Sequence, residues 1–363
     1  MKIIIVYASA GAGHKKAAEA LYGYFKQRLP PGEIEIVDIL EKTRPFFKKA
    51  YTNGYNFLIN NCLWLWHLLF WITALKFLRK FNSSWSMALN RAFAAEFSRY
   101  IIKENPDLII STHFLPPEIC VYLKQKNKIS SRIATVVTDY GIHPFWIHEG
   151  TDKYIVASDL SQQELAGQGI KKEKIISCGI PIDPKFALVK DKRAICEKLG
   201  IKNGVFTVLI TTGSSGIGPI EEIVESLKDN LQVLVVCANN KTLFQNLSAK
   251  NYPYLKVFGF VNNIEELMAV SDLVIAKPGG MTTSEILCME LVPIFISPIP
   301  GQETMNLKAM AKLGIGHSPR KINEIKEIIF NYRDNPQKIL AQKEKIRKIK
   351  KPNAAEDIYN ALC

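Results

Sequence analysis

Histidines and a carboxylate occur at points where short apolar runs of the sequence end in turns. His14 closes a glycine-containing stretch after the first run, His113 follows a second run, and Asp139 follows a third. Because the carboxyl ends of parallel strands meet at one edge of a sheet, we expect these three side chains to open onto one crevice. A histidine that takes a proton from a hydroxyl, beside a carboxylate that orients it, forms a general base. A hydrogen-bonded structural histidine and a turn aspartate are the alternatives.

The stretch before His14 contains Gly11 and Gly13, which permit a sharp turn and the close approach of a ligand to the backbone. Dinucleotide binding is an alternative, since Asp38 ends the second apolar run where a ribose-binding acid would lie. The third glycine of the dinucleotide motif is replaced by Lys16, however, and a P-loop lysine is out of register. The loop predicts a ligand site without favouring a dinucleotide.

Three turns in the second half also follow apolar runs. Residues 211–218 and 276–285 are expected to cradle phosphate with backbone amides, and Glu285 is expected to accept hydrogen bonds from a ribose. A capping box from Thr282 to Glu285 is the structural alternative. In the turn 300–306, two polar residues suit sugar hydroxyls, whereas Asn306 is interpreted as a helix N-cap. The candidate ligand-binding residues are Gly13, Gly213, Ser214, Ser215, Gly280, Met281, Thr282, Thr283, Glu285, Gln302 and Glu303.

These turns require strands and helices that alternate along the chain. Continuous β-branched runs separated by helical stretches predict doubly wound α/β domains with parallel sheets. A break near 179–184 divides the runs into two series, so we expect a first domain over 1–183, a second over 184–340, and a C-terminal helical segment over 341–363. The seven scattered cysteines predict a reduced cytosolic protein without a metal site.

The segment 52–80 departs from this pattern. Residues 52–75 contain no formally charged side chain, and an apolar stripe at helical spacing runs from Phe57 to Leu78. Topology argues against a bilayer span, because the flanking strands should share one sheet. Tryptophans beside basic residues are typical of an interfacial helix on anionic lipid, and a buried helical hairpin is the alternative. The expected acceptor- or membrane-facing residues are His113, Trp146, Trp64, Trp66 and Trp71.

The net charge of +13 favours an anionic partner, which could be nucleic acid, a lipid surface or a phosphate-bearing substrate, and residues 1–180 carry +8 of it. We find no nucleic-acid-binding motif, so charge alone does not predict a nucleic-acid partner. A lipid surface, with a nucleotide as a second anion, is the favoured interpretation. The basic run Lys343–Lys351 contributes to the excess, with a solvated helix face as the alternative.

Five ordered motifs carry a family resemblance: GAGH at 11–14, VVTDYGIHPFW at 136–146, GIPIDP at 179–184, KPGGMTTSE at 277–285 and PGQE at 300–303. Together they resemble the monogalactosyldiacylglycerol synthase group of glycosyltransferases, and most of all the processive diacylglycerol glucosyltransferases. The resemblance implies a GT-B fold with an acceptor domain, a nucleotide-sugar domain and a cleft between them. It further implies a UDP-hexose donor, a diacylglycerol-type acceptor, inversion at the anomeric carbon, no tightly bound cofactor and no obligatory metal.

By resemblance, His14 is the base, Asp139 belongs to the threonine–aspartate motif, and Glu285 binds ribose. Gln302 and Glu303 match the sugar-contacting pair. The chain departs from many relatives at Asp183, where they have Arg, and more mildly at Ala12.

The expected protein is a peripheral enzyme on the cytoplasmic face of the membrane. An N-acetylglucosaminyltransferase acting on a polyprenyl-linked peptidoglycan precursor and a non-catalytic UDP-sugar sensor are the alternatives.

Overall fold

The computed structural model describes residues 1–9, 11–74, 94–213, 216, 218–227 and 231–363. The chain forms two compact units, each considered by itself. Unit 1 comprises Met1–Asp183, Ile299–Asn306 and Asn353–Cys363, and unit 2 comprises Pro184–Pro298 and Leu307–Pro352.

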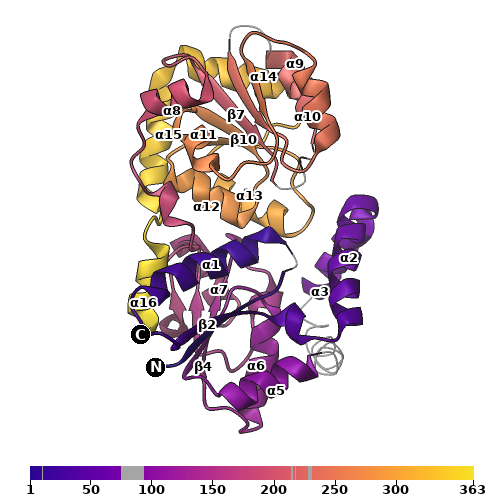
Figure 1. Cartoon of the computed structure of the whole chain (residues 1–363), viewed down its shortest axis with the longest axis vertical. Coiled ribbons are helices and arrows are strands. Elements are labelled where there is room, and N and C mark those ends of the chain that lie inside the picture. The colour runs from indigo at the N-terminus through magenta and orange to yellow at the C-terminus, as the bar shows by residue number, and fades with distance from the viewer. Residues whose placement is uncertain (10, 75–93, 214–215, 217, 228–230) are drawn as a thin grey trace. The chain divides into compact units, whose positions relative to one another are not determined.

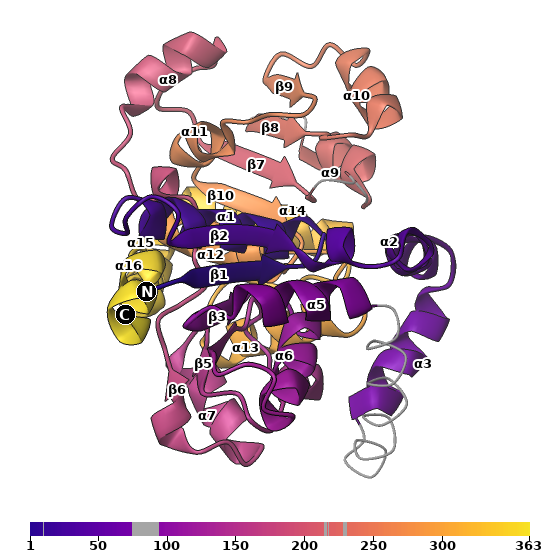
Figure 2. The same ribbon diagram turned by 60° about the horizontal axis from the view of Figure 1, so that its bottom comes forward.

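Unit 1 is built on a six-stranded parallel sheet in the order β2-β1-β3-β4-β5-β6. Alternate side chains of β1 enter two cores, as expected for a strand covered on both faces. Ile3 and Ile5 pack with residues of α1 (Ala12–Lys26) and α16 (Ala354–Leu362). Ile4 and Val6 pack with residues of α5 (Ala95–Glu104) and α6 (Leu115–Gln125). Figure 2 shows α1 on one side of the sheet and α5 and α6 on the other. The strands are β1 Ile3–Tyr7, β2 Ile34–Asp38, β3 Leu108–Ser111, β4 Arg132–Val136, β5 Lys153–Ile155 and β6 Ile175–Ile176.

The helices of unit 1 include one from the far end of the chain. In α16, Ile358 and Leu362 are buried in the core shared with α1, and the Tyr359 ring lies 5.0 Å from that of Phe25. The C-terminal helix therefore completes unit 1 (Figure 1). The helices are α1 Ala12–Lys26, α2 Pro45–Asn61, α3 Leu63–Ala74, α5 Ala95–Glu104, α6 Leu115–Gln125, α7 Asp159–Gly167 and α16 Ala354–Leu362, with 3-10 turns η1 Ile39–Lys42, η2 Pro144–Trp146 and η3 Lys172–Lys174.

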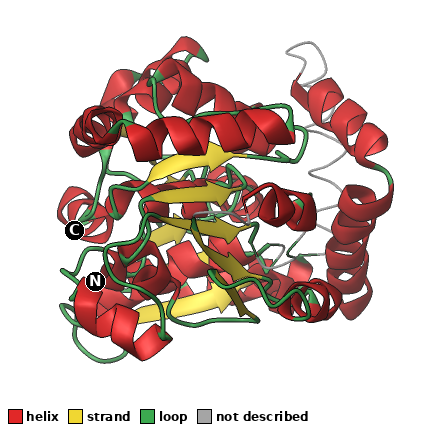
Figure 3. Ribbon diagram, turned by 90° about the horizontal axis from the view of Figure 1, so that it is seen from above, coloured by secondary structure: helices red, strands yellow, loops and turns green. Residues whose placement is uncertain are grey.

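Unit 2 contains a five-stranded parallel sheet in the order β11-β10-β7-β8-β9. Its strands are β7 Thr207–Thr211, β8 Gln232–Val236, β9 Leu255–Phe258, β10 Leu273–Ala276 and β11 Val292–Phe295. Helices surround the strands (Figure 3). They are α8 Lys192–Leu199, α9 Ile220–Leu227, α10 Lys241–Ser248, α11 Ile264–Ala269, α12 Gly280–Cys288, α13 Gln302–Lys312, α14 Ile322–Asp334 and α15 Pro336–Ile349, with the 3-10 turn η4 Pro184–Phe186. The first turns of α13 are counted with unit 1.

The helices α2 and α3 lie at the end of the first sheet toward which β1 and β2 point (Figure 2). Across the described parts of the chain, no helix combines the length and apolarity that a bilayer crossing requires. The predicted segment 52–80 is described as far as Ala74, and its remaining residues lie outside the described ranges.

Candidate functional site

The first candidate site lies where the strand order of unit 1 changes direction. β1 pairs with β2 on one side and with β3 on the other, so the chain leaves the two central strands toward opposite edges. Open parallel sheets bind ligands at the carboxyl ends of such strands. The loop after β1 leads to His14 on α1, and the turn after β3 carries Thr112 and His113. The topology therefore brings the two histidines to one place.

The first turn of α1 leaves room for a ligand to approach the backbone closely. Gly11 precedes the helix with φ of 97°, a conformation that side chains disfavour, and no side chain caps the first turn. The first amides of α1 are thus not satisfied by a capping side chain, as at anion-binding helix termini. Gly13 lies within this turn. Ala10 is outside the described residues.

His14 is oriented by two polar groups. Its Nδ1 lies 2.7 Å from the Thr112 carbonyl oxygen and 3.0 Å from the Thr138 hydroxyl. A carbonyl oxygen can only accept, so the contact with Thr112 places the proton of the neutral ring on Nδ1. Thr112 also donates its hydroxyl to the His14 carbonyl oxygen at 2.8 Å. The lone pair of the neutral ring is therefore on Nε2.

The charge state of His14 agrees with this arrangement. Burial lowers the pKa of His14 to about 4, and the hydrogen bond to the Thr112 carbonyl opposes this shift. His14 is consequently neutral at physiological pH. A neutral imidazole with a fixed proton on Nδ1 can accept a proton at Nε2.

His113 packs against His14. The two ring centroids are 4.5 Å apart in an edge-to-face arrangement, and His113 stacks on Phe114 at 4.1 Å. Its Nδ1 accepts the backbone N–H of Leu115 at 3.1 Å, which places the proton of the neutral ring on Nε2. Burial, and then repulsion from His14, lower the pKa of His113 well below its usual value. His113 is a neutral, buried neighbour of the candidate base.

Asp139 follows Thr138 but does not orient His14 directly. Its carboxylate accepts hydrogen bonds from the Asn306 amide at 3.0 Å and from Trp146. Burial raises the pKa of Asp139 to about 6, against the lowering effect of these two donors. The Trp146 ring is 6.0 Å from that of His14. Within the described ranges no hydrogen bond joins His14 to Asp139, so the orienting contact comes from Thr112.

The second candidate site lies at the corresponding point of unit 2. β7 pairs with β8 on one side and β10 on the other, and the turns after β7 and β10 carry the two predicted phosphate cradles. Gly213 adopts φ of 78° and Gly216 φ of 58°. A Cβ on Gly216 would lie 2.4 Å from the Cys237 carbonyl oxygen, so this turn requires glycine. Ser214 and Ser215 lie outside the described residues.

The turn after β10 leads directly into α12. Gly279 is the N-cap without a capping side chain, and Thr282 is already the third residue of the helix. The capping-box alternative is therefore wrong. Gly280, Met281, Thr283 and Glu285 are buried, and Thr282 is half-buried. The hydroxyls of Thr283 and of Thr212, after β7, are buried and have no hydrogen-bond partner in the part of the chain that the structure describes. Both hydroxyls are available to donate to a ligand bound at these turns.

Gln302 and Glu303 open α13 and are both half-buried. Glu303 accepts the backbone N–H of Ile299 at 2.7 Å. Asn306 is not the N-cap that the sequence suggested: it lies inside α13, fully buried. Its side-chain oxygen accepts the N–H of Tyr140 at 2.7 Å, and its amide donates to Asp139. The sequence does not predict this link or the contacts of Thr112 and Thr138 with His14.

Two family models match consecutive parts of the chain. The monogalactosyldiacylglycerol (MGDG) synthase family matches residues 14–182, and the glycosyltransferase family 28 C-terminal domain matches residues 207–358. A processive diacylglycerol beta-glucosyltransferase from Bacillus cereus (strain G9842) is 32% identical over 99% of this chain and 93% of its own length. The chain belongs to the diacylglycerol glucosyltransferase family. The predicted resemblance is confirmed.

Solved structures support the fold of this family member. MurG from Acinetobacter baumannii aligns with a TM-score of 0.62 at 15% identity, covering 100% of this chain and 99% of that one. HepE from Anabaena in complex with UDP aligns with a TM-score of 0.59 at 15% identity, with the same coverage. The predicted GT-B class, with two parallel-sheet α/β domains, is confirmed.

The tryptophans expected at the acceptor or membrane surface fall into different environments. Trp64 and Trp71 are 70% and 39% exposed, whereas Trp146 is buried beside His14. Trp66 is half-buried and donates its indole N–H to the Pro300 carbonyl oxygen at 2.9 Å. The described residues contain no cluster of three or more His, Cys, Asp or Glu side chains able to hold a metal ion.

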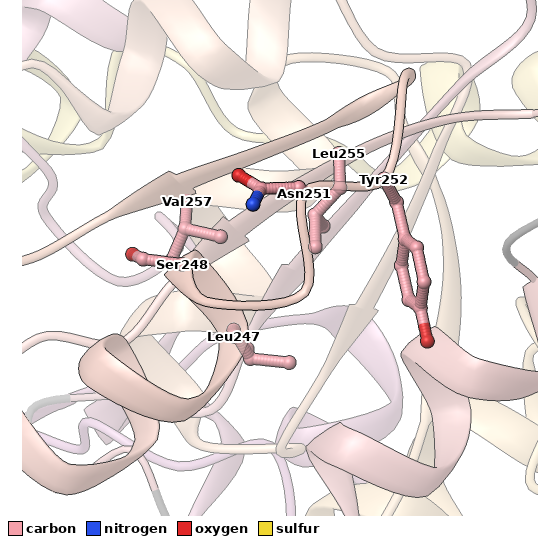
Figure 4. A pocket seen from close by; sticks show the side chains of 6 residues that line it. All are labelled: Leu247, Ser248, Asn251, Tyr252, Leu255 and Val257. Carbon is pink, nitrogen blue, oxygen red and sulfur yellow. The ribbon is translucent and has the colours of Figure 1, made fainter.

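A hollow of about 320 Å³ occurs elsewhere in unit 2 (Figure 4). It lies between the end of α10 and β9 and carries no charged side chain. None of the candidate site residues lines it. The lining residues are Leu247, Ser248, Asn251, Tyr252, Leu255 and Val257.

Proposed function

We propose that this glycosyltransferase moves a hexose, glucose or galactose, from a UDP-sugar to diacylglycerol or glycosyldiacylglycerol, with inversion at the anomeric carbon. The observation that carries the proposal is the fixed tautomer of His14, which leaves Nε2 free to accept a proton. Family membership supports the lipid acceptor, because relatives that are 32% and 31% identical to this chain are named processive diacylglycerol beta-glucosyltransferases.

In this mechanism Nε2 of His14 takes the proton of the lipid hydroxyl. The hydroxyl oxygen attacks the anomeric carbon as the bond from that carbon to the UDP oxygen breaks, and the electron pair leaves on the diphosphate. One displacement from the opposite face inverts the configuration. Asp139 is ionised above about pH 6, and its negative charge would stabilise the imidazolium formed on His14.

Unit 2 would bind the UDP group. The uncapped start of α12 presents backbone amides to the diphosphate, and the buried Thr212 and Thr283 hydroxyls supply further donors. Glu285 would accept hydrogen bonds from the ribose, and Gln302 and Glu303 of unit 1 would contact the hexose. The backbone amides of α12 and the two threonine hydroxyls would stabilise the leaving diphosphate without an obligatory metal.

We also propose that α2 and α3 dock on an anionic lipid surface at the cytoplasmic face of the membrane. The outward residues of the predicted stripe are Phe57, Trp64, Leu68 and Trp71, all exposed. No Asp or Glu occurs between Glu41 and Glu96, while Arg44 and Lys49 are exposed beside the apolar residues. Aromatic side chains flanked by bases favour the interface of a negatively charged leaflet.

The deciding experiment incubates the protein with vesicles containing diacylglycerol and, separately, UDP-glucose, UDP-galactose or UDP-N-acetylglucosamine. Mass analysis of the lipids identifies the donor and the number of sugars added, and NMR of the product establishes its anomeric configuration. His14→Ala should lower the rate by about 10²–10⁴-fold while UDP affinity is retained. Lys15→Ala, an exposed neighbour on α1, is the matched control. UDP-sugar binding without transfer would indicate a sensor, and transfer by His14→Ala at the wild-type rate would refute the base.

A further inference from the structure

Helix α3 has two faces with different surroundings. Trp64, Leu68 and Trp71 recur at helical spacing and are 70%, 49% and 39% exposed. Trp66 and Phe70 lie one turn apart on the inward side, where Trp66 is half-buried and Phe70 is buried. The helix therefore has an outward apolar face and an inward face that carries Trp66 and Phe70, which we call the inward anchors.

The inward anchors contact the turn that precedes α13. The indole N–H of Trp66 donates to the Pro300 carbonyl oxygen at 2.9 Å. The Phe70 ring lies directly on Gly301, where an added Cβ would be 2.8 Å from the ring. We call residues 299–303 the sugar loop, because it ends in Gln302 and Glu303.

His143 also contacts Phe70. The two ring centroids are 4.1 Å apart, and the Phe70 carbonyl oxygen accepts from His143 Nε2 at 3.2 Å. His143 Nδ1 in turn accepts the N–H of Phe145 at 3.2 Å, which leaves the proton of the neutral ring on Nε2. The main chain of α3 is thus bound to the same loop region that contains Asp139 and Trp146.

We propose that Trp66 and Phe70 are positioning residues that connect the outward face of α3 to the sugar loop. When the outward face is seated on an anionic lipid surface, the inward anchors hold Pro300 and Gly301, and through them Gln302 and Glu303, in place. The role of the loop in sugar binding rests on the proposed function. The mechanical link itself rests on the contacts of Trp66 and Phe70.

The link can be measured without any transfer reaction. Hydrogen exchange of the backbone amides at 301–306 is followed with and without vesicles of phosphatidylglycerol and phosphatidylcholine. We expect vesicle binding to slow exchange by about threefold or more in the wild type. Trp66→Phe should still bind vesicles but lose most of this slowing, because it keeps an aromatic ring beside Phe70 and removes the N–H donor. Trp64→Phe, an equivalent change on the outward face, should retain the slowing.

A kinetic readout separates positioning from general stability. With a water-soluble short-chain acceptor, Phe70→Leu should raise KM for the UDP-sugar about three- to tenfold with UDP affinity unchanged, because the change displaces the sugar loop and leaves the turns after β7 and β10 untouched. Equal slowing of exchange in Trp66→Phe and the wild type would overturn the proposal, as would a wild type that does not bind vesicles or binds without slowing. Slowed exchange in a wild type that transfers no hexose would support the link and contradict the proposed function.

Discussion

The side-chain amide of Asn306 donates to Oδ1 of Asp139 across 3.0 Å, although the two residues are 167 positions apart in the chain. The Asn306 oxygen meanwhile accepts the backbone N–H groups of Tyr140 and Gly141 at 2.7 and 3.2 Å. Helix α13 lies so close to the loop that carries Asp139 that a Cβ added to Gly141 would be 2.6 Å from Met305 Cβ. One buried amide thus holds both the backbone and the carboxylate of the candidate acid–base loop.

This contact predicts a specific change in pH dependence. The acid limb of activity should lie near pH 6 and belong to Asp139, since the pKa of His14 is about 4. Asn306 stabilises the carboxylate, so Asn306→Ala should raise the pKa of Asp139 further and move the acid limb to higher pH. Rates measured from pH 5 to 9 test this. Thr304→Ala, which replaces a half-buried residue of the same helix, is the control and should leave the acid limb of the pH–rate profile unchanged. If Asn306→Ala also leaves the acid limb unchanged, Asp139 is not its source.

A second prediction concerns the buried hydroxyl of Thr283. Because this hydroxyl has no hydrogen-bond partner among the described residues, Thr283→Val removes an unsatisfied polar atom and should leave the thermal stability of the ligand-free protein equal or higher. If the hydroxyl serves the nucleotide, UDP affinity should fall by about two- to tenfold. Calorimetric titration with UDP measures this loss. Ser284→Ala is the control, because the Ser284 hydroxyl already donates to the Gly280 carbonyl oxygen, and equal affinity in Thr283→Val would remove Thr283 from the site.

The sequence was sufficient to predict the sheets and the place of His14. Continuous apolar strands alternating with helices require buried parallel sheets, and the carboxyl ends of such strands converge by topology alone. The sequence therefore predicts His14 and His113 at one crevice, and their ring centroids are 4.5 Å apart.

Asn306 and Trp66 could not be placed from the sequence for a physical reason. Local pattern identifies which residues share a helix face but does not tell what that face contacts. The stripe of Trp64, Leu68 and Trp71 was correctly grouped, yet its exposure and the inward contact of Trp66 with Pro300 depend on tertiary packing. The sequence predicts Asn306 as a helix N-cap, but α13 begins four residues earlier, at Gln302.

The exposed face of α3 yields a third prediction. Replacing Trp64 and Trp71 by Ser should weaken binding to phosphatidylglycerol vesicles by about tenfold or more, because two large aromatic side chains no longer enter the interface. Transfer to a water-soluble acceptor should change little. Vesicle sedimentation measures the binding, which should also weaken with added salt. Leu188→Ser removes an exposed apolar side chain from unit 2 and should bind as the wild type does. Undiminished sedimentation of the double variant would show that this face does not meet the lipid.

The last prediction uses the contact between Gly301 and Phe70 as a double-mutant cycle. Gly301 has φ of 102°, so Gly301→Ala introduces backbone strain of about 1–2 kcal/mol and also drives its Cβ into the Phe70 ring. Gly32→Ala, at φ of 86° with open space around it, carries the strain without the collision and is the matched control. Gly301→Ala should therefore destabilise the protein more than Gly32→Ala does. Phe70→Ala removes the ring, so in that background Gly301→Ala should lower the free energy of unfolding by no more than the backbone strain. Thermal unfolding of the wild type, the two single variants and the double variant measures the coupling energy between the two positions. Additive losses would mean that the ring and the glycine do not touch in solution.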